Sequence, residues 1–572
     1  MSAAALARST WHRMVVLLPA KADFAAMRRQ PRRDLIAGLT VAVVALPLAL
    51  GFGVSSGLGA AAGLATAIVA GILAALFGGS NLQVSGPTGA MTVVLVPIVA
   101  RYGPGGVFTV GVLAGLILLA LALLRAGRYV RYVPAPVAEG FTVGIAAVIF
   151  LQQVPAALGV PNPDGEKVTA VAWRAVVEFA GHPNWSALMV ALGVAAAMLA
   201  GARWRPTVPF SLIAVAGATV IGQLLSLNVA RIGVLPATLP VPSLGFLDPA
   251  AVPTLFTSAL AVAALAALES LLSATVADGM TVNQRHDPDR ELFGQGVANV
   301  VTPLFGGVPA TAAIARTAVN VRSGAQSRLA SLTHAIALAV IILVAAPLVA
   351  YIPLAALAGV LLATAVRMVE VGSLAALARA TRSDALIMAL TAIATLALDL
   401  IAAVGIGLVL AAALAIRKIA NASRLEEVPL DITDHHVEEA ALLREHIVAY
   451  RFDGPLIFAA AHRFLRELSQ VADVRVIILR MSRVSTIDGT GARVLRDAIE
   501  RLEHRGITVY VSGVPTGHEK ALDAVGVLDR LRAADRVFPG TPEAIAAARA
   551  HLHRTGVLTT DEPNVIDSAS TS

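Results

Sequence analysis

The stretch "SGPTGAMT", Ser85 to Thr92, places two glycines, a proline and three hydroxyl side chains inside the most apolar part of the chain. Proline and glycine both disfavour the interior of a helix, so a helix running through this region is predicted to break here. A second stretch, "GGVPATAA", Gly306 to Ala313, repeats the pattern later in the chain. These two breaks decide which architecture the rest of the sequence supports.

The composition around these breaks is that of a polytopic membrane protein. Of the 572 residues, 57% are hydrophobic and only 14% are charged, and the mean hydropathy is +0.76. Apolar runs recur from about Leu35 to Ile416, each close to the roughly 20 residues that a helix needs to cross a bilayer. After Arg417 charged residues return at ordinary density, which predicts that a soluble domain follows the membrane domain.

Fourteen apolar segments can be counted, starting near residues 35, 58, 87, 106, 135, 186, 208, 254, 292, 309, 328, 353, 384 and 401. We expect an N-terminal arm at 1–34, a transmembrane domain at 35–420, a linker at 421–440, a soluble domain at 441–555 and a flexible tail at 556–572. The transmembrane domain divides into repeats at about 35–228 and 254–420. The arm has no apolar run long enough for a cleaved signal, so the first segment is expected to be a retained span.

Positive charges are distributed unevenly between the loops. If the N-terminus is cytoplasmic, eighteen lysines and arginines fall on the cytoplasmic side and four on the other: Arg101, Lys167, Arg174 and Arg231. This bias predicts a multi-pass plasma (inner) membrane protein with both termini in the cytoplasm. It also explains the net charge of +7 better than nucleic-acid binding does. Cysteine is absent, which excludes disulfides and thiolate metal sites.

The third and tenth segments are too short to span a bilayer. Residues 87–100 would form a helix of about 21 Å and residues 309–320 one of about 18 Å, against a hydrocarbon core of about 30 Å. Each follows one of the two breaks, and third and tenth are equivalent places in two repeats of seven. Short, interrupted segments at equivalent places indicate an inverted-repeat transporter with its site between the two half-helices.

The chemistry predicted for the breaks is anion binding. With Pro87 and Pro309 in the first helical turns, backbone amides would be free donors at the positive ends of two helix dipoles, namely those of Thr88, Gly89, Ala90, Ala310, Thr311 and Ala312. Two such ends facing each other can bind an anion, and the hydroxyls of Thr88 and Thr311 would add to the site. Arg316 would raise its positive potential or pair with a carboxylate, and the first is favoured. The alternative is that both segments are simply kinked structural helices.

Glu269 is the clearest carboxylate at membrane depth, about fifteen residues into the eighth segment. Ser273 lies on the same helix face, and carbonyls near Gly306 and Gly307 could complete a set of hard oxygen ligands for sodium. A proton on Glu269 would serve equally, and a structural hydrogen bond is the alternative. Six other acidic residues lie near segment ends, where interfacial solvation suffices: Glu139, Asp278, Glu291, Glu370, Asp384 and Asp399.

Several motifs resemble the sulfate permease (SulP, solute carrier 26) family of anion transporters. They are "SGPTGAMTVV", "ALESLLSATVAD" and "RELFGQGVANVVTPLFGGVPATAAIARTAVNVRSGAQS", in family order over almost the whole chain. The resemblance implies seven-plus-seven inverted repeats with core and gate domains, elevator-like movement, a homodimer and a cytoplasmic STAS domain.

Within that family, "LTVAVVALPLALGFGVSSGLGAAAGL" is most similar to the sodium-dependent bicarbonate transporters. In that subgroup an Asp and a Thr help to bind sodium where this chain has Glu269 and Ser273. The wider family's Pro-Gln pair and following Tyr appear here as Pro47, Leu48 and Phe52, which weakens sulfate as the substrate. An offset of 222 residues between the repeats places Pro47 opposite Glu269, so the first and eighth segments are expected to complete the site.

Strand-like and helix-like runs alternate from about residue 446, which indicates an α/β sheet with right-handed crossovers. The run "VSTIDGTGARVL" resembles the STAS domain, in which some bacterial regulators carry a phosphorylatable serine directly after the aspartate. Gly489 occupies that position here, and the next residue, Thr490, is expected to cap a helix, with modification as the alternative. We expect a dimerisation or regulatory module.

These observations together predict a symporter that moves a small inorganic anion, bicarbonate first and sulfate second, inward with sodium or a proton. The alternatives are a dicarboxylate or other organic-anion transporter, an anion exchanger and, less favoured, a membrane-anchored STAS signalling adaptor. No hydrolase, kinase or metal constellation occurs in the sequence, so an enzyme is not expected, and no cofactor beyond a possible sodium ion is expected.

Overall fold

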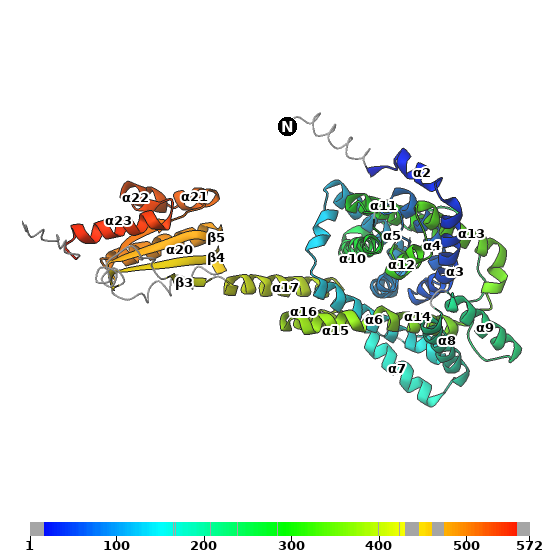
Figure 1. Ribbon diagram of the computed structural model, residues 1–572. Coiled ribbons are helices and arrows are strands. Elements are labelled where there is room, and N and C mark those ends of the chain that lie inside the picture. Colours follow the sequence, from blue (N-terminus) through cyan, green and yellow to red (C-terminus); the bar gives the residue numbers. More distant parts are fainter. Residues whose placement is uncertain are drawn as a thin grey trace, which may run out of the picture. The chain divides into compact units, whose positions relative to one another are not determined.

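The computed structural model describes residues 17–163, 165, 167–205, 208–236, 238–282, 284–398, 400–422, 424–428, 445–459 and 474–557. The chain divides into two compact units, Met1–Ala411 and Ala412–Ser572, each described by itself (Figure 1). Asp399, most of the predicted linker, the helix-like run at residues 460–470 and most of the predicted tail lie outside the described residues.

The first unit is helical. In its described part nine helices are long and apolar enough to cross a membrane. The helices of this unit, the last of which runs into the second, are α2 (Lys21–Met27), α3 (Pro31–Ser55), α4 (Ala60–Phe77), α5 (Gly89–Leu123), α6 (Ala135–Leu158), α7 (Val168–Gly181), α8 (Trp185–Trp204), α9 (Phe210–Leu224), α10 (Val252–Gly279), α11 (Pro288–Val301), α12 (Ile314–Arg322), α13 (Arg328–Val349), α14 (Leu354–Met368), α15 (Val371–Ala380), α16 (Arg382–Ala397) and α17 (Leu400–Ala422).

The predicted third and fourth segments form one element, α5. Gly103 interrupts it with φ 65° and ψ −171°, a conformation outside the helical region, and Pro104 follows directly. A glycine is required at such a positive φ, since other residues are strained there. The part of α5 before Gly103 is therefore a short helix of its own.

The helices pack in two groups (Figure 1). One consists of α3, α4, α5, α10, α11, α12 and α13, and the other of α6, α7, α8, α9, α14 and α16. Within the first group two very short strands meet, β1 (Ser85–Gly86) and β2 (Thr311–Ala312), pairing antiparallel with Gly86 opposite Thr311. The two breaks, far apart in sequence, are thus in direct contact.

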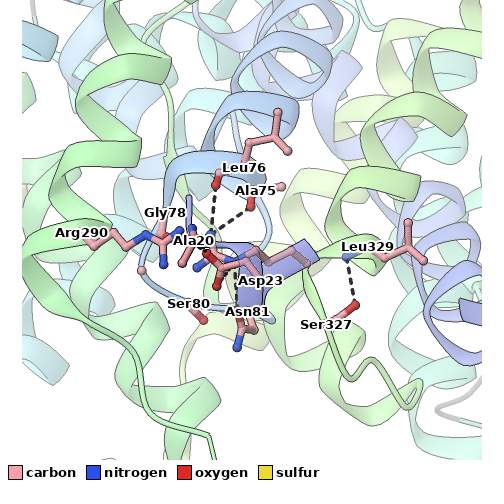
Figure 2. Close-up of polar contacts among 12 residues, drawn as sticks. Ala20, Asp23, Ala75, Leu76, Gly78, Ser80, Asn81, Arg290, Ser327 and Leu329 are labelled. Atoms are coloured by element: carbon pink, nitrogen blue, oxygen red, sulfur yellow. Dashed lines mark hydrogen bonds and ion pairs between the residues drawn. The ribbon is translucent and has the colours of Figure 1, made fainter. Parts of the chain in front are cut away.

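The short helix α2 is tied to the first helix group through Asp23. Its carboxylate accepts a hydrogen bond from Nη2 of Arg290 at 2.6 Å and lies 3.6 Å from Nε of Arg328 (Figure 2). Arg328 also donates from Nη1 to the carbonyl of Gly78, at 2.6 Å, at the end of α4. One carboxylate thereby joins α2 to α11 and α13.

The second unit is an α/β sheet, as the sequence predicts. Its strand order is β3 (Arg424–Val428), β4 (Ile447–Leu456), β5 (Val476–Ile487), β6 (Thr508–Ser512) and β7 (Val537–Phe538), with only β3 antiparallel to its neighbour. Alternate residues of β5 point to opposite faces. Ile477 packs with α20 (Gly489–His504), α21 (Thr516–Asp523) and α22 (Val527–Ala533), whereas Ile478 packs with α23 (Thr541–Arg554).

The cap of α20 differs from the prediction. Asp488, not Thr490, is the capping residue: its Oδ1 accepts the amide of Gly491 at 2.7 Å and its Oδ2 that of Phe458 at 3.0 Å. Thr490 lies inside the first turn with its side chain exposed. An aspartate accepts these amide hydrogens at least as well as a threonine would, and its position one residue before the helix is the one that capping requires.

Candidate functional site

At the second break, backbone amides donate hydrogen bonds to side chains from three helices. Three alternate amides donate to three side chains: Val308 to Oγ1 of Thr66 in α4 (2.7 Å), Ala310 to Oδ1 of Asn299 in α11 (2.8 Å) and Ala312 to Oγ of Ser270 in α10 (3.2 Å). Non-helical backbone within a membrane needs such partners. The break is therefore a built feature rather than a distorted helix.

This arrangement corrects one prediction about the anion site. Pro309 is not in a first helical turn, because α12 begins only at Ile314. The amides of Ala310 and Ala312 donate hydrogen bonds to side chains, and Thr311 lies in β2. This stretch therefore does not offer a row of free donors. The first-turn amides of α12 belong instead to Ile314, Ala315 and Arg316.

The backbone of the first break is held in the same way by groups around α12 and α13. The carbonyls of Leu82 and Gln83 accept from Asn320 and Ser331, both at 2.7 Å, and the amide of Val84 donates to Oγ1 of Thr317 at 3.1 Å. The first break is thus supported by helices of the second half of the chain, whereas the second break is supported by α4 of the first half and by α10 and α11 of its own half.

The helix α5 starts two residues later than the sequence predicts. Thr88 is its cap, with Oγ1 accepting the amide of Met91 at 3.4 Å, and Pro87 precedes the helix. The amides of Gly89 and Ala90 occupy the first turn, where an α-helix provides no internal acceptor for them. These two predicted donors therefore lie where the positive end of the helix dipole is strongest.

Gly89 is enclosed by two apolar side chains. A Cβ atom on Gly89 would lie 2.2 Å from Cδ1 of Ile149 in α6 and 3.1 Å from Cε1 of Phe52 in α3. Phe52 thus lies beside the start of α5, where the sequence predicted a lining residue. Pro47 and Leu48 are buried in α3, and Leu48 belongs to the apolar cluster that includes Leu64, Leu357 and Leu361.

Glu269, a residue of α10, lies beside the start of α5. Its Oε2 accepts a hydrogen bond from Oγ1 of Thr88 at 2.9 Å, and Thr311 and Arg316 also interact with the carboxylate. Its side chain keeps some accessible surface, whereas its neighbour Ser270 is fully buried. The structure thus brings Glu269 together with Thr88, Thr311 and Arg316, three of the predicted anion-site residues.

The other two predicted ion ligands have other contacts. Ser273 donates to Oγ1 of Thr317 at 3.1 Å. A Cβ atom on Gly307 would lie 2.4 Å from Cγ2 of Thr302 and 3.0 Å from Oγ1 of Thr66, so its backbone packs against α4. The hydroxyl that does reach β2 from α10 is Ser270, 2.9 Å from Oγ1 of Thr311. The sequence did not predict Ser270, because it follows Glu269 directly and neighbouring residues point to different sides of a helix.

Arg316 lies against the first break. Its Nη2 donates a hydrogen bond to the carbonyl of Pro87 at 2.6 Å. A Cβ atom on Gly86 would lie 2.7 Å from its Nη1, so only glycine fits there. The buried guanidinium therefore cross-links α12 to the entry of α5 and places a positive charge near Glu269.

The prediction that Glu291 is solvated near a segment end is wrong. The residue is buried, with 2% of its surface exposed. Its two oxygens accept four N–H groups, two of them from the turn after α4, far away in the sequence. Carboxylates are tolerated in such surroundings when every oxygen is hydrogen-bonded.

Comparisons with known proteins agree with this architecture. YvdB of Bacillus subtilis (strain 168), a putative sulfate transporter, is 34% identical over 511 residues, which cover 87% of this chain and 94% of that protein. The bicarbonate transporter BicA of Synechocystis sp. is 34% identical over 509 residues, covering 86% and 90%. The solved transmembrane domain of a cyanobacterium bicarbonate transporter BicA superimposes with a TM-score of 0.60 at 35% identity, covering 66% of this chain and 98% of that one.

Two family matches divide the chain as its two units do. Residues 440–544 match the STAS domain, and residues 32–391 match the sulfate permease family. The second match covers most of the chain and includes both breaks, α5, α10 and α12. The chain therefore belongs to the sulfate permease family.

Proposed function

We propose that the protein is a secondary active transporter that moves a small inorganic anion, bicarbonate first and sulfate second, together with sodium or a proton. The observation that carries this proposal is the 2.9 Å hydrogen bond from Thr88, the cap of α5, to Glu269. It joins a group suited to binding anions to a group suited to binding a cation.

The anion would bind at the start of α5. The amides of Gly89 and Ala90 and the positive charge of Arg316 favour a negative ligand there, and helix N-termini bind anions without a direct cation contact. Backbone amides and a helix dipole respond to charge more than to shape. The side chains of Phe52 and Ile149 crowd Gly89, which favours a small ligand over a large one. The names of the relatives, a bicarbonate and a putative sulfate transporter, agree with this class of substrate.

Electrostatics supplies a reason for coupling. An ionised Glu269 would repel an anion brought to the start of α5, by about 4 kcal/mol for charges about 4 Å apart at an effective dielectric constant of about 20. A sodium ion or a proton on the carboxylate removes that repulsion. Binding of the anion and of the cation would therefore favour each other, which is what symport requires.

The two helix groups suit alternating access. Both breaks lie in one group, while Ile149 of the other group touches Gly89 and Gln153 donates to Ser55 of α3 at 3.0 Å. An elevator-like movement would carry the first group, with its ligands, past the second and would break these contacts. We further propose a homodimer, which the family resemblance implies, in the plasma (inner) membrane. The positive charges of the loops favour an orientation with both termini in the cytoplasm.

Uptake by purified protein in liposomes tests this function. Labelled bicarbonate, sulfate and fumarate are compared, with sodium and pH gradients imposed separately. Bicarbonate uptake driven by one of these gradients is the expected result, and Glu269→Gln should abolish the gradient dependence. Uptake that ignores both gradients would exclude symport and favour an exchanger. Preference for fumarate would indicate an organic-anion transporter, and the absence of any flux would favour a signalling adaptor.

A further inference from the structure

One face of α11 carries three polar side chains in a membrane-buried position. Glu291, Gln295 and Asn299 follow each other at intervals of four residues, so they lie on the same side of the helix. All three are buried, with 2% exposure for Glu291 and none for the other two. A buried polar row of this kind is costly unless each group is hydrogen-bonded.

At the start of this row Glu291 is fully used as an acceptor. Its donors are the amides of Gly79 (2.9 Å) and Ser80 (3.2 Å), Nε2 of Gln83 (2.8 Å) and Nε2 of Gln295 (2.9 Å). A carboxylate accepts and does not donate, so it requires the NH2 end of the Gln295 amide to face it. Glu291 thereby sets the orientation of Gln295.

The rest of the row holds both breaks. The same Nε2 of Gln295 donates to Oγ of Ser85 at 2.7 Å, the first residue of β1. Asn299 accepts the amide of Ala310 at 2.8 Å and donates to its carbonyl at 2.9 Å, directly before β2. A single helix therefore sets the positions of the two strands.

The equivalent face in the first half of the chain lacks this row. The helix starts Gly89 and Ile314 are 225 residues apart (314 − 89), rather than the 222 that the two prolines predicted; counted back from these starts, the positions of Glu291, Gln295 and Asn299 correspond to Thr66, Ala70 and Ala74 of α4. Thr66 still holds Val308, but two alanines replace the two amides. The first half of the chain thus folds with an apolar helix face at this place. We therefore infer that the side-chain amides of Gln295 and Asn299 in α11 serve the breaks rather than helix packing alone.

We propose that Gln295 is a positioning residue for the anion site. By holding Ser85 it fixes β1, and through the rigid Pro87 it fixes Thr88 and the first amides of α5. This inference rests on the proposed function, because it concerns how the anion site of that transporter is held. Ser85 is the residue through which Gln295 acts.

The test measures the KM and the maximal rate of bicarbonate uptake in proteoliposomes for four proteins: wild type, Gln295→Leu, Ser85→Ala and the double variant. Loss of the hydrogen bond to Ser85 should raise KM about tenfold in Gln295→Leu, the size expected for one well-placed hydrogen bond. Ser85→Ala should raise KM similarly. The double variant should be no worse than either single one, since both remove the same contact.

A matched control is Gln284→Leu, which removes a half-buried amide that donates to the carbonyl of Gln326 at 3.0 Å, between other elements. Its KM should equal that of wild type. If Gln295→Leu does not fold, Ser85→Ala decides the question, because it removes the acceptor of the same hydrogen bond and leaves the contact between Gln295 and Glu291 in place.

Two results would overturn the inference: a lower maximal rate in Gln295→Leu with unchanged KM, or KM increases in the two single variants that multiply in the double variant. The first outcome would mean that Gln295 only stabilises the fold, and the second that it does not act through Ser85. A wild-type protein that takes up none of the anions is a different result, because it rejects the proposed function itself.

Discussion

The hydroxyl of Thr88 donates to the carboxylate of Glu269 over 2.9 Å, while the same oxygen caps α5. The two residues come from different halves of the chain, and the contact joins α5 to α10. Any cation, proton or anion that binds at one of these residues must therefore affect the other. The first prediction follows from this relationship.

Replacing Thr88 with alanine removes both the cap of α5 and the donor to Glu269. Loss of a threonine cap costs about 0.5–2 kcal/mol, and the anion site is expected to lose a similar part of its binding energy. The KM for the anion should rise about tenfold, and the dependence on the sodium or pH gradient should weaken. Thr88→Ser, which keeps the hydroxyl, should restore both. Equal KM values for wild type and Thr88→Ala in proteoliposome uptake would contradict this.

A methyl group at Gly89 should block the site. In Gly89→Ala the new Cβ would meet Cδ1 of Ile149 at 2.2 Å, so the Ile149 side chain, α6 or the start of α5 must shift. We expect transport to fall at least tenfold, since overpacking of this kind costs about 1–3 kcal/mol. Combining Gly89→Ala with Ile149→Ala should recover part of the rate.

Gly193→Ala in α8 is the matched control for Gly89→Ala. It adds the same methyl group to a helix where nothing lies within 4 Å of the new Cβ. Transport by this variant should be unchanged. If Gly193→Ala lowers the rate as much as Gly89→Ala does, helix glycines are sensitive in general and the contact with Ile149 is not the cause.

The membrane fold and the two breaks could be predicted from the sequence, because hydropathy and proline and glycine in an apolar run are local signals. The details of the breaks could not. Pro87 and Pro309 were expected to begin helices, but α5 begins at Gly89 and α12 only at Ile314, with β1 directly before Pro87 and β2 between Pro309 and α12. A two-residue strand leaves no trace in composition or periodicity. Its partner also lies in the other half of the chain.

The prediction that Glu291 contacts water was wrong for a related reason. The position of Glu291 near the end of an apolar segment predicted contact with water. The donors that make burial possible come from Gly79, Ser80 and Gln83, more than 200 residues earlier in the chain. Reasoning from one segment at a time cannot detect donors supplied by another. Conversely, Glu269 was found because an acid in the middle of a span is conspicuous on its own segment.

The attachment of α2 should depend on pH through Asp23. Burial raises the pKa of this carboxyl, but the hydrogen bonds from Arg290 and Ala20 and the charge of Arg328 outweigh it and hold the pKa below its usual value. A lowered pKa adds stability above the pKa of the unfolded chain, about 3.9, and this stability is lost as the pH falls through the lower folded value. Asp23→Asn should therefore lower the melting temperature equally at pH 7 and pH 5.

As the pH falls from about 4 through the lowered pKa of Asp23, the melting temperatures of Asp23→Asn and wild type should converge, because the wild-type carboxyl then becomes protonated too. Thermal unfolding of the full protein in detergent at several pH values measures this. A difference that persists at low pH would show that the aspartate acts through its shape rather than its charge.

In the α/β unit, Gly491→Ala should destabilise the sheet. Gly491 lies in the first turn of α20, and its Cβ would lie 1.9 Å from the carbonyl oxygen of Leu456 in β4, so helix and strand must separate. The expected loss is about 2–3 kcal/mol of unfolding free energy. Gly489→Ala, two residues earlier with nothing within 4 Å, should be neutral or slightly stabilising because alanine favours a helix. Limited proteolysis of the full-length variants in detergent compares the two. Equal protection of both variants would mean that α20 can shift without loss, and that its close approach to β4 is not required for the unit to fold.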